Sequence, residues 1–155
     1  MSESVERVRA TLIAAGHPDT ITMFPEGTRT AQDAADAVGC TVAQIAKSIV
    51  LRAGEQPLLV IASGANRVDL CKIAAAVGQP VKPADGRWVR DTVGYAIGGI
   101  APIGHDRRLR VFIDADLLQH DPIWAAAGTP RHVFRTTTRD IARMTAGTVT
   151  DVKEG

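Results

Sequence analysis

Lysine is rare in this 155-residue chain, and one lysine stands where it could do chemistry. Of the 18 cationic side chains, 14 are arginine and four are lysine. Lys47 begins an expected strand, in which alternation places it on the same, more apolar face as Ile49 and Leu51. An ammonium group held there at the mouth of a pocket can receive a phosphate or a developing oxyanion. The alternative is a lysine whose stem packs on the sheet while its charge reaches solvent.

A glycine-rich loop offers a second kind of chemistry. The segment is too rich in glycine for the interior of an element and too apolar for a solvated linker: Gly98-Gly99-Ile100-Ala101-Pro102-Ile103-Gly104-His105. Adjacent glycines allow main-chain N–H groups to approach a ligand, and Pro102 stiffens the loop, so that it can hold a carbonyl or a carboxylate. A tight bend between strands is the alternative. Neither GxGxxG nor GxxxxGK[ST] occurs, which excludes the usual nucleotide-phosphate loops.

Other residue types that carry catalysis are scattered along the chain. No GxSxG elbow is present and no cysteine has the spacing to pair with a histidine, so a hydrolase of this sequence would use water as its nucleophile. The two cysteines are predicted to be reduced and buried. Metal-ligand spacing is absent among the cysteines and histidines, which are Cys40, Cys71, His17, His105, His120 and His132. We therefore expect neither a metal nor a cofactor.

Residues 33–47 have a weak likeness to a helix-turn-helix. Gly39 would form the turn, and Val42 and Ile45 would anchor the second helix. That helix would offer only Gln44 and Lys47 to bases or phosphates, where a reading helix normally presents several such side chains. Sequence-specific DNA binding is therefore not expected. The alternative to an enzyme is a non-catalytic regulator that binds tRNA or DNA through this segment.

Short helices and strands must position these residues. Apolar periodicity, caps and turn residues predict helices over 5–13, 30–39, 41–44, 69–78, 85–92 and 137–144, a helical turn over 114–119, and strands over 21–24, 48–52, 58–61, 109–113, 123–127 and 132–135. The strands 48–52 and 58–61 should form an antiparallel hairpin. Because no regular βαβ period appears, we predict an α+β fold: one domain over residues 1–155, with a mixed, curved, partly barrel-like sheet flanked by helices.

The charge balance limits the kinds of partner. Eighteen basic and 17 acidic residues give a net charge of +1, which excludes a protein that grips nucleic acid along its whole length. Residues 87–143 are mildly basic, with nine Arg against six Asp. The N-terminus lacks the apolar core of a signal peptide, and no run approaches the ~20 apolar residues of a membrane span. We expect no membrane partner and a cytoplasmic location.

Several motifs occur together in the order of a known family. Thr30-Ala31-Gln32-Asp33-Ala34-Ala35, then Gly39, then Ile45-Ala46-Lys47-Ser48-Ile49-Val50, then the loop from Gly98 to Gly104 resemble the YbaK family of aminoacyl-tRNA editing domains. These are free-standing relatives of the editing domain inserted in bacterial prolyl-tRNA synthetase. The resemblance extends from about Val5 to Val149. Its most specific features are the lysine before the hairpin and the GxxxP loop, here Gly98 to Pro102.

The resemblance implies a metal-independent aminoacyl-tRNA deacylase. Such an enzyme hydrolyses the ester that joins a wrong amino acid to the 3′-terminal adenosine of a tRNA. Lys47 would anchor the terminal nucleotide or the reacting ester, and Gly98, Gly99 and Pro102 would frame the aminoacyl group and donate main-chain hydrogen bonds to it. The neighbouring ribose hydroxyl can help to activate water. The implied partners are a mischarged tRNA and an aminoacyl-tRNA synthetase.

The resemblance also suggests which residues contact the substrate. Substrate contacts are expected from Ile100, Ala101, Ile103, Gly104 and His105, in a small pocket for an amino acid such as Ala, Ser, Thr or Cys. Cysteine is less favoured, because members that edit cysteinyl-tRNA carry an acidic residue in the late strand, where this chain reads Arg131-His132-Val133-Phe134. The tRNA surface is expected to include Arg107, Arg108 and Arg131.

Overall fold

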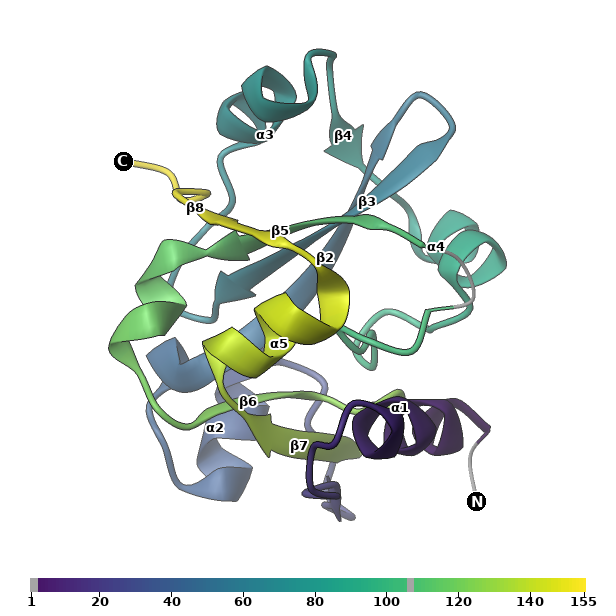
Figure 1. The fold of residues 1–155 in the computed structure, drawn as a ribbon, viewed down its shortest axis with the longest axis vertical. Helices are drawn as coiled ribbons and strands as arrows, with labels where there is room; N and C mark the ends of the chain where they lie inside the picture. Colours follow the sequence, from purple (N-terminus) through teal and green to yellow (C-terminus); the bar gives the residue numbers. More distant parts are fainter. Residues whose placement is uncertain (1–2, 106–107) are drawn as a thin grey trace.

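A computed structural model describes residues 3–105 and 108–155 as a mixed β-sheet with helices packed around it (Figure 1). Arg107 lies outside the described residues. The α-helices are α1 (Glu3–Ala14), α2 (Ala31–Val38), α3 (Leu70–Val77), α4 (Gly86–Val93) and α5 (Thr138–Thr145). Two short 3-10 segments are η1 (Val42–Gln44) and η2 (Ala115–Gln119). The strands are β1 (Thr22–Met23), β2 (Ile45–Ala53), β3 (Gln56–Ser63), β4 (Lys82–Pro83), β5 (Arg110–Asp114), β6 (Ile123–Ala126), β7 (His132–Thr136) and β8 (Thr148–Thr150).

The strands form one sheet of mixed direction. Its order is β1-β7-β6-β2-β3-β5-β8, and β4 pairs with β2 beside this path. The pairs β1/β7, β6/β7, β2/β3 and β2/β4 are antiparallel, whereas β2/β6, β3/β5 and β5/β8 are parallel. This path has two ends, β1 and β8, so the described sheet is not closed into a barrel. The predicted α+β class with a mixed sheet is confirmed.

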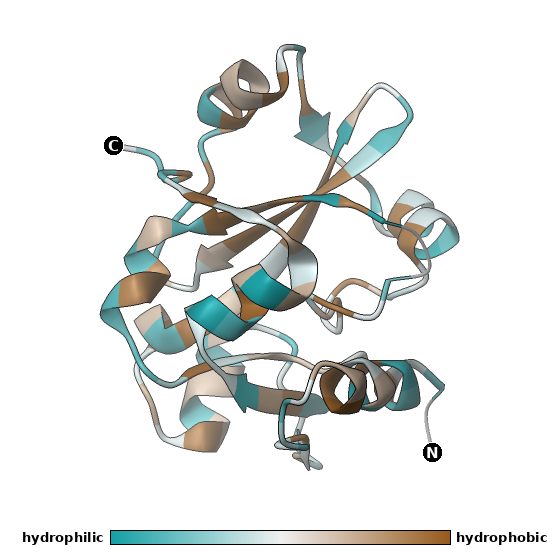
Figure 2. Ribbon diagram, in the orientation of Figure 1, coloured by the Kyte–Doolittle hydropathy of each residue, from teal (hydrophilic) through white to brown (hydrophobic). Residues whose placement is uncertain are grey.

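The hairpin of β2 and β3 forms the centre of the sheet. It runs antiparallel as predicted, with the last pair, Ala53 and Gln56, enclosing a two-residue turn. Because side chains alternate along β2, successive residues pack into different hydrophobic clusters. Val50 belongs to the larger buried cluster, and Leu51 belongs to a second cluster with Ile73 of α3. Figure 2 shows hydrophobic residues concentrated where β2, β3 and β5 meet.

Polar caps and glycine fix the ends of α2, the helix that lies beside the start of β2. Thr30 and Asp33 form a reciprocal capping box at its N-terminus. Gly39 ends it in the left-handed conformation, with a φ of 79°. Ala35 of α2 and Ile45 of β2 belong to one buried cluster. The predicted helix over 30–39 is therefore held against the strand that carries Lys47.

The helix-turn-helix hypothesis for residues 33–47 is wrong. Gly39 does end α2, but η1 is a single 3-10 turn and β2 begins at Ile45. Ile45 pairs with Trp124 of β6, so the residues expected on a second helix, Lys47 among them, lie in the sheet. This segment has no second helix that could enter a DNA groove.

Two smaller expectations also change. Cys71, predicted to be buried, is exposed on α3, whereas Cys40 is partly buried and burial raises the pKa of its thiol. Both thiols are free. The strands β4 and β8 were not expected, because two or three residues are too few to show alternation. Among residues 3–105 and 108–155, no helix is long and apolar enough to cross a membrane.

Strand β2 has a gap in its pairing on the edge opposite β3. On that edge β6 pairs with Ile45 and Ala46, and β4 pairs with Leu51 and Arg52. Between them, residues 47–50 have no strand partner on this edge within the described part of the chain. The gap leaves the main chain beside Lys47 without a strand partner on this edge.

Candidate active site

A cavity of about 230 Å³ lies at the beginning of this gap. Its walls come from segments far apart in the sequence: the loop into α2 with α2 itself, the start of β2, the glycine loop, and β6 with β7. The lining residues are Thr28, Arg29, Thr30, Ala31, Ala34, Ile45, Ala46, Lys47, Ser48, Ile97, Gly98, Ile100, Trp124, Ala125, Ala126 and Val133. None of these lining residues is Cys, His, Asp or Glu, so Arg29 and Lys47 carry the formal charges of the wall.

Lys47 is half-buried in this wall. Its Nζ donates a hydrogen bond of 2.6 Å to the main-chain oxygen of Asn66. Burial lowers the pKa of the Lys47 ammonium below its ordinary value, and the positive charge of Arg67 lowers it further, while Asp114 opposes both. The sequence-based prediction that Lys47 lies at a pocket is consistent with this position. Its catalytic role stays a prediction.

The glycine loop touches the cavity at its first half. Gly98 has a φ of 96°, a conformation that favours glycine, and its Cα lies against Arg29. A Cβ on Gly99 would come within 2.6 Å of the main chain of Thr129, a contact that no side chain can make. Gly98 and Ile100 line the cavity, and Gly99 is the point where the loop packs on the segment between β6 and β7.

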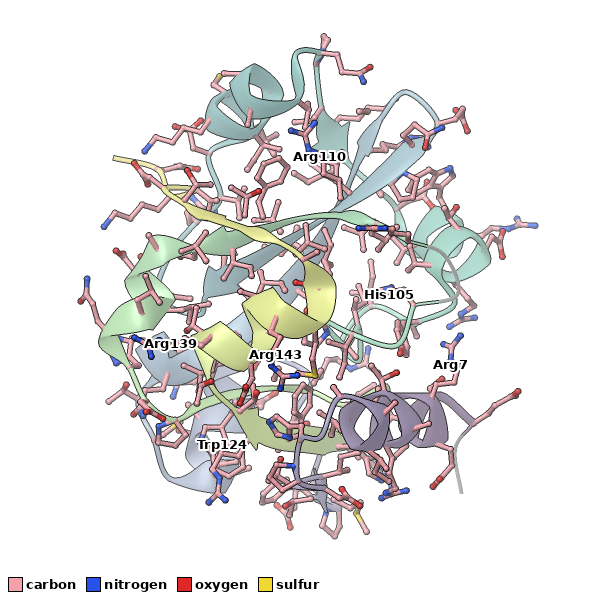
Figure 3. All side chains as sticks on the ribbon, viewed as in Figure 1. Arg7, His105, Arg110, Trp124, Arg139 and Arg143 are labelled. Carbon is pink, nitrogen blue, oxygen red and sulfur yellow. The ribbon has the colours of Figure 1, made fainter. Side chains whose placement is uncertain are left out.

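The second half of the predicted loop site lies elsewhere. Ala101 and Ile103 are buried in the main core, and neither lines the cavity. Pro102, Ile103, Gly104 and His105 line a separate hollow together with residues near α1 and α5. Figure 3 shows His105 well apart from Trp124, which lines the cavity.

This second half is held in place by internal contacts. The hydroxyl of Tyr95 lies 2.9 Å from the main-chain oxygens of both Ile103 and Gly104. Nε2 of His105 lies 2.7 Å from the oxygen of Ala101, and its ring meets Tyr95 edge-on at 5.1 Å between centroids. These contacts indicate that the residues after Ile100 brace the loop, while Gly98 and Ile100 face the space a ligand would fill.

Several residues of the cavity wall were not singled out from the sequence, among them Ser48, Arg29 and Trp124. Ser48 contributes a hydroxyl whose oxygen is buried and has no hydrogen-bond partner within the described residues. Arg29 precedes the cap of α2, and Trp124 is partly buried on β6. Only Ser48 had a usable signal, because alternation placed its hydroxyl on the same face of the strand as Val50.

The predicted tRNA-contacting arginines are not gathered around the cavity. Arg131 lines a hollow together with Arg29, which also lines the cavity, so Arg131 lies next to the candidate site. Arg108 lines hollows near Leu109 and Arg110 instead. The described residues also include no group of three or more His, Cys, Asp or Glu side chains that could hold a metal ion.

The fold and cavity define a small α+β domain that presents a lysine and a glycine loop to a confined, mostly apolar space. Residues 25–144 match the sequence model of the family described as the aminoacyl-tRNA editing domain, and the chain belongs to that family. The resemblance inferred from the sequence motifs is thereby confirmed.

Individual relatives agree with this assignment. One solved structure, of a candidate trans-editing enzyme for prolyl-tRNA synthetase, is 42% identical, with a TM-score of 0.93, over 100% of this chain and 99% of that one. A second, from work on epitope backbone grafting onto scaffold proteins, is 40% identical with a TM-score of 0.93 and full coverage of both chains. The uncharacterized protein YwhH of Bacillus subtilis is 25% identical over 142 residues, which are 91% of this chain and 90% of YwhH.

Proposed function

We propose that this protein is a free-standing deacylase that hydrolyses the ester of a mischarged aminoacyl-tRNA. The observation that carries the proposal is that Lys47 and Gly98 line one small cavity in a chain of the editing family. In this proposal the ammonium of Lys47 anchors the terminal nucleotide or the developing oxyanion. Main-chain N–H groups of the loop beginning at Gly98 hold the aminoacyl group.

Water is the nucleophile in the proposed reaction. It adds to the ester carbonyl, the tetrahedral intermediate expels the ribose oxygen, and the proton lost by water is returned to that oxygen. The products are the free amino acid and the tRNA. The lining residues include no Cys, His, Asp or Glu that could act as a nucleophile or general base. In the proposed reaction the neighbouring ribose hydroxyl of the substrate therefore helps to activate the water.

The proposed substrate carries a small amino acid such as Ala, Ser, Thr or Cys. The volume of about 230 Å³ and the short side chains of Ala34, Ala46 and Ala125 leave room for a small side chain. Cysteine is the less favoured, because β7 contributes Val133 to the wall and not the acidic residue that members editing cysteinyl-tRNA carry in the late strand. The relative described for prolyl-tRNA synthetase supports tRNA charged by that synthetase as the substrate, and a tRNA partner implies a cytoplasmic location.

The test is a panel of tRNA for proline, charged separately with Ala, Ser, Thr, Cys and Pro. We expect multiple turnovers on at least one small non-cognate ester and no hydrolysis of the prolyl ester. Lys47→Ala should lower kcat/KM by about 100-fold, the cost of removing one oriented charge-stabilising group. Lys82→Ala is the matched control, because Lys82 lies exposed on β4 and does not line the cavity.

Two results would count against the proposal. Hydrolysis by Lys47→Ala at the wild-type rate would remove the assigned site. Binding of aminoacyl-tRNA without turnover beyond one equivalent would favour the alternative of a non-catalytic binding module.

A further inference from the structure

The ammonium of Lys47 is held by a main-chain atom, and that atom belongs to a turn. The acceptor is the carbonyl oxygen of Asn66, at 2.6 Å, in the segment that leaves β3. A carbonyl has no conformational freedom apart from its backbone, so the direction of the ammonium depends on how firmly this turn is fixed. The position of the Lys47 ammonium therefore depends on residues outside the cavity wall.

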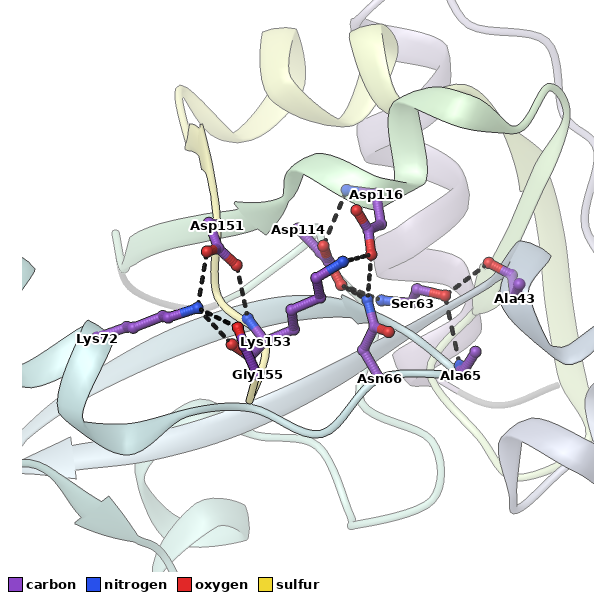
Figure 4. Close-up of polar contacts among 10 residues, drawn as sticks. All are labelled: Ala43, Ser63, Ala65, Asn66, Lys72, Asp114, Asp116, Asp151, Lys153 and Gly155. Carbon is purple, nitrogen blue, oxygen red and sulfur yellow. Dashed lines mark hydrogen bonds and ion pairs between the residues drawn. The ribbon is translucent and has the colours of Figure 1, made fainter.

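The side chain of Asn66 fixes the turn through two carboxylates. Its Nδ2 donates to Oδ2 of Asp114 at 2.8 Å and to Oδ2 of Asp116 at 2.9 Å (Figure 4). Asp114 is buried, with 1% of its surface exposed, and it also accepts hydrogen bonds from the main-chain N–H groups of Ser63 and Asp116. The carboxylate of Asp114, at the end of β5, thus joins the end of β3 to the turn.

The C-terminal segment completes this arrangement. Nζ of Lys153 lies 2.8 Å from the same Asp116 oxygen that accepts from Asn66. The hydrogen bond from Lys153, and then that from Asn66, hold the pKa of Asp116 below its ordinary value. The segment itself is docked, because Val152 is fully buried and its oxygen accepts from the N–H of Asp69 at 2.8 Å.

Lys72 anchors the same segment from the other side. Its Nζ donates to Asp151 at 2.7 Å and to the main-chain oxygen of Lys153 at 2.6 Å (Figure 4). Lys72 therefore secures the C-terminal segment without touching Asp116 or Asn66, which makes it a matched control for Lys153.

We propose that Asn66 is a positioning residue for Lys47, and that Lys153 locks it in place from the C-terminal segment through Asp116. The amide of Asn66 bridges two carboxylates, and the ammonium of Lys153 offsets the second of these negative charges. Loss of either group frees the turn, and the carbonyl that aims Lys47 moves with it. The activity readout rests on the proposed deacylase function, but the positioning itself does not.

A double-mutant cycle tests the proposal through activity. Asn66→Ala should lower kcat/KM by about 10- to 100-fold, the effect of a misplaced catalytic group. In a Lys47→Ala background the same substitution should have no further effect, because a residue that acts only through Lys47 has nothing left to position. An equal loss in both backgrounds would show a general structural role and overturn the proposal.

The lysines near the C-terminus give a second arm. Lys153→Ala should reproduce the loss in part, Lys153→Arg should restore it, and Lys72→Ala should leave activity within about twofold of wild type. Equal losses in Lys153→Ala and Lys72→Ala would mean that docking of the C-terminal segment, and not the link to Asn66, is what matters. Urea denaturation identifies any variant that fails to fold.

A measurement without tRNA separates this inference from the proposed function. In protein labelled with ¹³C-lysine, the four lysines give few enough signals to resolve. A fixed Lys47 should show two distinct Hε shifts that merge in Asn66→Ala and in Lys153→Ala but not in Lys72→Ala. Distinct shifts retained in Asn66→Ala would refute the positioning role, whether or not the wild type hydrolyses any aminoacyl-tRNA.

Discussion

At the scale of single residues, the wall of the cavity contains a hydroxyl group that the protein itself does not satisfy. The oxygen of Ser48 is buried and has no hydrogen-bond partner within the described residues. A buried polar group without a partner costs about 1–3 kcal/mol of folding free energy. Because Ser48 lines the cavity beside Lys47, a bound ligand could supply the missing partner.

Replacing Ser48 by alanine should separate stability from activity. We expect the free energy of unfolding to stay the same or to rise by up to about 1 kcal/mol, since no hydrogen bond is lost. If the hydroxyl contacts the substrate, kcat/KM for the preferred ester should fall. Urea denaturation and deacylation by the same preparation measure the two effects.

Ser63 provides the matched control for this substitution. Its hydroxyl is buried too, but it donates to the oxygen of Ala43 at 2.8 Å, so Ser63→Ala should lower the free energy of unfolding by about 1 kcal/mol. Equal destabilisation by the two serine substitutions would show that Ser48 has a partner within the folded protein.

At the scale of elements, the glycine loop is positioned by its contact with the turn between β6 and β7. Gly99→Ala places a methyl group 2.6 Å from the main chain of Thr129, so loop and turn must separate. We expect a loss of about 1–3 kcal/mol in the free energy of unfolding, typical of overpacking. Deacylation should fall with it, because Gly98 and Ile100 move away from the cavity. Chemical denaturation and kcat/KM check both.

Gly39→Ala is the control for the cost of glycine conformation alone. Gly39 also has a positive φ, of 79°, but a Cβ there meets nothing within 4 Å. Its replacement should cost about 1 kcal/mol and leave kcat/KM unchanged. If Gly99→Ala behaved like Gly39→Ala in both measurements, the close contact with Thr129 would not position the loop.

Elements with local signals could be predicted from the sequence, and elements made by distant contacts could not. The start of α2 is determined by a capping box whose two partners, Thr30 and Asp33, lie in one four-residue segment. The sequence is therefore enough to predict where this helix begins. Thr41 and Gln44 form a similar box, yet only one 3-10 turn follows, because Ile45 is recruited into the sheet by Trp124, far along the chain. Local signals therefore predicted the short helical segment, and tertiary pairing ended it after one turn.

The same distinction applies to the candidate site. Lys47 and Gly98 stood out because lysine is rare and adjacent glycines are unusual, and both line the cavity. Trp124 reaches that cavity because β6 runs parallel to β2, a pairing between residues about 80 positions apart. No residue spacing in the sequence predicts the pairing of β2 with β6.

At the scale of the whole molecule, a net charge of +1 leaves the tRNA to be held by a few local contacts. Arg131 and Arg29 line one hollow beside the cavity, whereas Arg108 lines other hollows. Arg131→Ala should weaken tRNA affinity severalfold and reduce the slope of log K against log salt by about 0.7, the value for one phosphate contact of a single strand.

Arg108→Ala is the comparison for this prediction. It removes the same charge from the molecule, so it should change the affinity less if contacts near the cavity dominate. Filter binding of uncharged tRNA over a range of salt concentrations measures both variants. A larger effect of Arg108→Ala would place the tRNA surface near Arg108 and not near Arg131.

At the gap in the pairing of β2, the strand that carries Lys47 meets the elements whose side chains shape the cavity. Ala46, Lys47 and Ser48 of β2 line the cavity and pair with β3, and this main-chain pairing does not depend on which side chains face the cavity. Other lining side chains come from α2, β6 and β7. Substitutions on those elements can reshape the space without changing the pairing of β2 with β3. Descendants of one ancestral domain can therefore diverge in the amino acid they accept while inheriting the same reaction.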